Sequence, residues 1–249
     1  LFVFLIPCAL FAYAVHPRPL QYLGITKPAN KAHWWIVLLI ALSAIPVVSG
    51  IAGLFDQIPL TAKLEADKVT FAAQQKAMLN LQTPGEFITA FVVVGIIAAV
   101  SEELLFRGIM MKFAAKKMVG NIFWPILLTA VFFATVHGNV VGFVSLVISG
   151  IILGYVYYFT GSLVLSMFTH FIVNGSQVVL MYFGRNNETM TKMMETNETP
   201  WGIFTAGIAV FIFSFYLLWK NRTPLPVSWT QDFTQEELEQ KVQDTNNPL

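Results

Sequence analysis

The chain has 249 residues, of which 56% are hydrophobic and only 12% are charged, and its mean hydropathy is +0.65. Soluble domains carry about 25% charged residues, so this composition argues against a water-soluble globular protein and predicts a polytopic membrane protein. The net charge of +1 argues against a nucleic-acid partner, and the single cysteine, Cys8, excludes a disulfide within the chain and a cysteine-based metal site.

Apolar runs of spanning length recur along the chain, and together they suit an all-α transmembrane bundle of about seven helices of ~20 residues. The first run starts without Met and is followed by no small-residue cleavage site, so we interpret it as a truncated span and not as a signal peptide. The predicted spans are 1–15, 34–55, 86–113, one from Trp124 through His137, 143–159, 163–183 and 201–219.

The runs divide the chain into four regions. Residues 1–85 hold the first spans and a polar connection, in which 63–81 can form an amphipathic surface helix with Leu64, Phe71, Met78 and Leu79 on its apolar side. Residues 86–183 form a helical core, 184–220 a polar loop and the last span, and 221–249 a soluble tail.

The cations near the span ends predict the orientation of the bundle. With alternating sides, one face holds Arg18, Lys27, Lys31, Lys112, Lys116, Lys117, Lys220 and Arg222. The other face holds Lys63, Lys68, Lys76, Arg185 and Lys192, fewer cations. Because cytoplasmic loops are enriched in Lys and Arg, we expect the C-terminal tail to lie in the cytoplasm. The compact form of the chain favours a multi-pass protein of a bacterial plasma membrane.

Three charges interrupt the third span, at Glu102, Glu103 and Arg107. Each charge at a bilayer centre costs at least ~2.5–3.5 kcal/mol on insertion scales, so the three are expected to face a protein interior. Glu103 and Arg107 are at i and i+4 on one helix face and can pair, whereas Glu102 is rotated by ~100°. A purely structural ion pair would leave Glu102 without a partner, which favours a functional role.

Two later spans carry further polar residues, His137 on one and His170 with Asn174 on the other. His170 and Asn174 are again at i and i+4, so they point into the same space. Either histidine alone is as well explained as a hydrogen-bonded core residue. At 1.5 Å per residue, however, Glu102, His137 and His170 all lie ~10–18 Å from the cytoplasmic span ends, which predicts one hydrated site in the cytoplasmic half of the bilayer.

The ordered set Glu102-Glu103-x-x-x-Arg107, Phe133-x-x-x-His137 and His170-x-x-x-Asn174 resembles the CPBP family of intramembrane proteases, also called the ABI or type II CAAX prenyl endopeptidase family. By resemblance, Glu102 is the catalytic glutamate, Glu103 its neighbour paired with Arg107, and His137, His170 and Asn174 complete the site. The family acts on membrane-associated peptides or proteins, including prenylated C-termini, bacteriocins and membrane-anchored proteins.

Peptide hydrolysis requires an activated water and donors for the developing oxyanion. A desolvated Glu102 takes up a proton readily and could act as the general base, with His137 positioning the water and His170 and Asn174 donating to the oxyanion. Glu102, His137 and His170 also form a two-histidine, one-carboxylate set that suits zinc, although the His-Glu-x-x-His spacing is missing. We favour metal-free water activation and keep zinc as the alternative cofactor.

Two other functional classes compete with a protease. A transporter also keeps Glu, His and Arg inside its spans, but it often shows inverted repeats, and none is evident here. A catalytically silent membrane scaffold is the second, and the intact set of polar residues argues against it. In every case the lipid bilayer is a partner of the chain.

Overall fold

A computed structural model describes residues 2–57, 61–78, 80–118, 120–140, 142–191, 199–225 and 229. Within these ranges every regular element is helical, which confirms the all-α fold class. The elements are α1 Phe2–Val15, α2 Pro19–Tyr22, α3 Ala32–Phe55, α4 Ala62–Met78, α5 Pro84–Ala90, η1 Phe91–Ala98, α6 Ala99–Glu103, η2 Leu104–Met110, α7 Met111–Lys117, α8 Phe123–Val136, α9 Phe143–Thr160, α10 Leu163–Gly184 and α12 Trp201–Lys220.

Five helical segments in the described chain are long and apolar enough to cross a membrane: Ala32–Phe55, Pro84–Lys117, Phe143–Thr160, Leu163–Gly184 and Trp201–Lys220. Two further apolar helices, Phe4–Val15 and Phe123–Val136, are shorter than a span. The chain is therefore an integral multi-pass membrane protein, but the predicted number of about seven spans is not confirmed.

The third predicted span is one continuous helical rod, Pro84–Lys117, built from α5, η1, α6, η2 and α7. It starts at a capping box, in which the backbone N–H of Glu86 donates to Thr83 Oγ1 and the backbone N–H of Thr83 donates to Glu86 Oε2. The rod is π-helical on both sides of the short α6 that ends with the two glutamates. Interruptions of this kind are frequent at functional sites.

The fourth predicted span ends within one residue of the expected position. We predicted that it passes through His137, and α8 has 14 residues and ends at Val136, with His137 as its C-cap. Gly138 adopts a φ of +63°, and its N–H bonds the carbonyl of Thr135, which ends the helix. A glycine in this left-handed conformation is a common helix stop. His137 therefore lies at the tip of α8.

Helices α8 and α9 approach each other closely at two glycines. A Cβ added to Gly150 would lie 2.7 Å from Ala130 Cβ, and one added to Gly154 would lie 2.8 Å from Ile126 Cγ2. Small residues spaced by four positions allow such contact between membrane helices. This contact also fixes the backbone of α9 beside the polar residues of the third span.

The predicted amphipathic helix at 63–81 exists as α4, Ala62–Met78, and Leu64 and Phe71 are partly buried in it. The side chain of Met78 and all of Leu79 lie outside the described residues, as does most of the predicted tail at 221–249.

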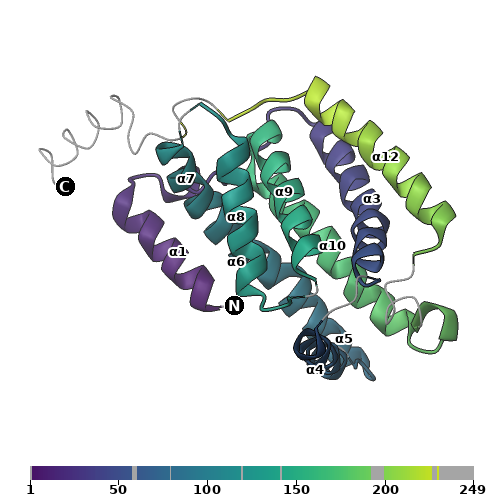
Figure 1. Cartoon of the computed structure of the whole chain (residues 1–249). Coiled ribbons are helices and arrows are strands. Elements are labelled where there is room, and N and C mark those ends of the chain that lie inside the picture. Colours follow the sequence, from purple (N-terminus) through teal and green to yellow (C-terminus); the bar gives the residue numbers. More distant parts are fainter. Residues whose placement is uncertain are drawn as a thin grey trace, which may run out of the picture.

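In Figure 1, the ends of α7, α9 and α12 lie at the top of the bundle, whereas α4 and α5 lie at the bottom.

Candidate active site

Glu102 and the two histidines predicted from the sequence converge on one point. Nε2 of His137, at the tip of α8, and Nε2 of His170, on α10, each lie 3.8 Å from Glu102 Oε2. That oxygen is buried and has no hydrogen-bond partner among the described residues. At this distance neither imidazole makes a direct hydrogen bond to the oxygen. The site therefore brings a lone carboxylate together with two imidazole edges.

Glu103 has the opposite environment, since its carboxylate accepts three hydrogen bonds. Arg107 Nη1 donates to Glu103 Oε1 at 2.5 Å, and His170 Nδ1 contacts the same oxygen at 3.0 Å. The hydroxyl of Ser166 donates to Glu103 Oε2 at 2.6 Å. All of these side chains are buried, so Glu103 joins the third span to α10 through charge-assisted bonds.

Arg107 extends the same network to α9. Its Nη2 donates to the carbonyl of Gly150 at 2.9 Å, and its guanidinium carbon lies 5.1 Å from the centre of the Phe133 ring on α8. The predicted Glu103–Arg107 pair is present within the third span. The two side chains together also contact α8, α9 and α10.

The Phe133 ring packs against both histidines of the candidate site. Its ring lies 4.5 Å from the His137 ring and 5.9 Å from the His170 ring, measured between centroids, and 5.2 Å from Phe106. Aromatic pairs at these separations restrict one another's orientation. Phe133 thus supports both imidazoles at once.

The hydrogen bonds of the histidines determine which nitrogen carries the proton. His137 Nδ1 bonds the carbonyl of Phe133 at 2.6 Å, and a carbonyl can only accept. His170 Nδ1 faces the carboxylate of Glu103, which also accepts. In the neutral imidazoles the proton therefore resides on Nδ1, and both Nε2 atoms present lone pairs toward Glu102.

Asn174 is near the cluster but is engaged elsewhere. Its Nδ2 donates to the carbonyl of Val94 on η1 at 3.2 Å, across the contact between α10 and the third span. No contact between Asn174 and Glu102 is recorded in the described residues. Ser101 is also turned away from the site, since its hydroxyl bonds the carbonyl of Ile97 at 2.6 Å.

The predicted zinc ligands have suitable chemistry but not suitable spacing. Each imidazole is held through Nδ1 by an acceptor, as metal-bound histidines usually are. Ligands around a tetrahedral zinc ion lie about 3.4 Å from one another, however, and here each Nε2 is 3.8 Å from Glu102 Oε2. Across the described chain no group of three His, Cys, Asp or Glu side chains is arranged to hold a metal ion. The three residues as placed do not fit zinc.

Sequence reasoning missed Ser166 and the carbonyl of Gly150. Ser166 has a local signal, because Ser166, His170 and Asn174 follow one another at intervals of four on α10 and share a face. Gly150 has no such signal, since its role is played by a backbone atom that only helix packing brings to Arg107.

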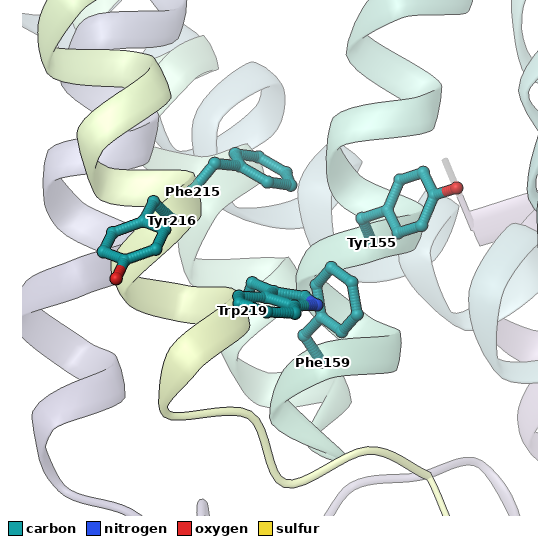
Figure 2. Close-up of a pocket in the computed structure, with 5 residues that line it drawn as sticks. All are labelled: Tyr155, Phe159, Phe215, Tyr216 and Trp219. Carbon is teal, nitrogen blue, oxygen red and sulfur yellow. The ribbon is translucent and has the colours of Figure 1, made fainter.

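An aromatic hollow of about 460 Å³ lies elsewhere, between α9 and α12 (Figure 2). Tyr155 and Phe159 line it from α9, and Phe215, Tyr216 and Trp219 line it from α12. Tyr216 and Trp219 are half exposed, and the hollow contains neither carboxylate nor imidazole. It suits contact with lipid chains and is separate from the polar cluster.

Comparison with known proteins gives a family match for the segment that holds these residues. Residues 84–176 match the family described as Type II CAAX prenyl endopeptidase Rce1-like. This segment runs from the start of α5 into α10 and includes Glu102, Glu103, Arg107, His137, His170 and Asn174. No curated protein and no solved structure gives a significant match.

Proposed function

Residues 84–176 belong to the type II CAAX prenyl endopeptidase (CPBP) family, and from this premise we propose that the chain hydrolyses peptide bonds of membrane-associated substrates with water activated by Glu102. The observation that carries the proposal is the contrast between two adjacent carboxylates. Glu103 is bonded by Arg107, His170 and Ser166, whereas the buried Oε2 of Glu102 has no partner among the described residues. An unpaired carboxylate facing two imidazoles is suited to take up a proton.

In the proposed reaction Glu102 accepts a proton from water while the water oxygen bonds to the carbonyl carbon of the scissile peptide. The carbonyl oxygen becomes an oxyanion, which the second amide hydrogen of Asn174 can stabilise, as can Nε2–H of His170 when that imidazole carries a second proton. The proton then passes from Glu102 to the peptide nitrogen, and the C–N bond breaks. His137 orients the water.

The test is cleavage of a quenched membrane-peptide library by the detergent-purified full chain. We expect Glu102→Gln to lower cleavage by at least 100-fold and to leave the folded protein intact, because glutamine keeps the shape but cannot accept the proton. Glu65→Gln, on the exposed helix α4, is the matched control and should cleave like the wild type.

Cleavage that survives Glu102→Gln would contradict the proposal. A library left intact by the wild type, together with vesicles in which Glu102→Gln alters solute uptake, would instead identify a transporter. If neither peptide cleavage nor solute uptake is observed, the result favours a non-catalytic membrane scaffold.

A further inference from the structure

The aromatic hollow between α9 and α12 lies near the ends of both helices. Its lining comes from residues 155–159 of α9, which ends at Thr160, and from residues 215–219 of α12, which ends at Lys220. The two helices have 18 and 20 residues. At 1.5 Å per residue these lengths are about 27–30 Å, close to the thickness of a bilayer's hydrocarbon core. The hollow extends only about 7 Å along each helix from its end, so it lies at the boundary between hydrocarbon and lipid headgroups.

The lining of the hollow suits an apolar occupant. Five aromatic side chains enclose about 460 Å³, which is within the roughly 300–1,000 Å³ of ligand sites. Figure 2 shows two of these side chains on α9 and three on α12, and none of them is charged. Tyr and Trp favour this level of a membrane because their rings combine an apolar body with a polar edge. An acyl chain fits such a surface, whereas a polar solute would lose its hydrogen bonds to water there.

A cation is held over one of the lining rings. The guanidinium carbon of Arg222 lies 4.7 Å from the centre of the Trp219 ring, and Arg222 Nη1 donates to the carbonyl of Trp219 at 2.7 Å. The remaining N–H groups of the guanidinium have the fork geometry that binds phosphate oxygens. Lys220 adds a second cation, and no carboxylate among the described residues forms an ion pair with either side chain.

The segment that carries Arg222 is fixed against the end of α9. The backbone N–H of Thr223 donates to the carbonyl of Phe159 at 2.7 Å, and the N–H of Leu225 donates to the carbonyl of Tyr158 at 3.1 Å. The last carbonyls of a helix have no partner within the helix, so these bonds satisfy acceptors that α9 leaves open. Arg222 therefore stands where α9 and α12 meet, beside the hollow that both helices line.

We propose that the hollow and Arg222 form a binding site for one phospholipid with an anionic headgroup. One acyl chain lies against the aromatic side chains, and the phosphate accepts hydrogen bonds from the guanidinium of Arg222. The two cations select an anionic lipid, because a zwitterionic headgroup carries its own cation, which Arg222 and Lys220 repel. The site is separate from Glu102 and its occupation does not depend on catalysis.

The end of α10 provides a matched control for the cation. Arg185 follows Tyr182 by three residues, lies 4.1 Å from the centre of its ring and donates to its carbonyl, as Arg222 does to Trp219. The Tyr182 ring, however, stacks on Phe87 at 4.7 Å and is not part of the hollow. Arg185→Gln thus removes the same charge from the same local arrangement without changing the proposed site.

The test is native mass spectrometry of the detergent-purified full chain, titrated with phosphatidylglycerol or with phosphatidylcholine of the same acyl chains. We expect the wild type to bind one phosphatidylglycerol with an affinity at least about 5-fold higher than that for phosphatidylcholine, which is the effect of one cation beside an anionic lipid. Arg222→Gln, which keeps the length of the side chain but removes its charge, should abolish this preference. Arg185→Gln should retain it.

A fluorescence measurement locates the acyl chain independently. Bromine atoms on a lipid chain quench the fluorescence of a tryptophan that they contact. Phosphatidylglycerol with brominated chains, added at one lipid per protein, should quench the wild type. Trp219→Phe keeps an aromatic ring in the lining and should lose most of that quenching.

Equal affinities of the wild type for the two lipids would overturn the proposal. An equal loss of preference in Arg222→Gln and Arg185→Gln would also overturn it, because the effect would then belong to any cation at a helix end. Quenching that persists in Trp219→Phe would place the acyl chain outside the hollow. A dimer that binds no lipid would show that a second copy of the chain covers the hollow instead.

Discussion

Ser166 donates its hydroxyl to Glu103 Oε2 at 2.6 Å, across 63 residues of sequence, and Glu103 in turn holds Nδ1 of His170 one helical turn beyond that serine. Two side chains of α10 thus share one buried carboxylate of the third span. Ser166 is a positioning residue, since it reaches the proposed reaction only through Glu103 and His170.

Replacing Ser166 with Ala should remove one of three donors to a buried charge. We expect a loss of stability of about 1–3 kcal/mol and a lower rate of cleavage, because Glu103 is then freer to rotate away from His170. Ser166→Thr keeps the hydroxyl and should restore the rate. The measurements are thermal unfolding in detergent and the pH profile of cleavage, which should shift in Ser166→Ala if Glu103 tunes His170. An unchanged profile would assign Ser166 a structural role only.

The two histidines should differ in their effect on stability. His170 is buried and bonded to Glu103, so His170→Ala should lower both cleavage and the unfolding temperature. His137 is half exposed at the tip of α8, so His137→Ala should abolish cleavage while the unfolding temperature changes little. Parallel cleavage and thermal unfolding assays check this, and equal destabilisation by both variants would contradict the described geometry.

The contact between α8 and α9 should not tolerate a methyl group at Gly150. An added Cβ would lie 2.7 Å from Ala130 Cβ, so Gly150→Ala must separate the helices and displace the carbonyl that Arg107 binds. We expect a loss of about 1–3 kcal/mol and reduced cleavage. Gly202→Ala, where an added Cβ meets nothing within 4 Å, is the control and should unfold like the wild type.

Metal dependence can be decided by measuring zinc in the purified protein and cleavage after chelation. Because Glu102 and the two histidines are spaced too widely for zinc, we expect less than about 0.1 zinc per chain and full activity in chelator. Stoichiometric zinc that is lost together with activity would show that the three side chains close around a metal and that Glu102 is a ligand.

The sequence alone determined the helical class, the position of the long apolar helices and the identity of the polar residues. These features are local or compositional, since hydrophobic length specifies a span and charges within it must face protein. The residues Glu102, Glu103, Arg107, His137 and His170 could be named for that reason, and the structure brings them together.

Only the tertiary structure decided which partners each of these residues contacts. The bonds from Ser166 to Glu103 and from Arg107 to Gly150 join segments that are 63 and 43 residues apart, so no local pattern specifies them. The sequence marks a turn at Gly138, but only the structure shows the left-handed conformation of this glycine and the position of His137 beside Glu102.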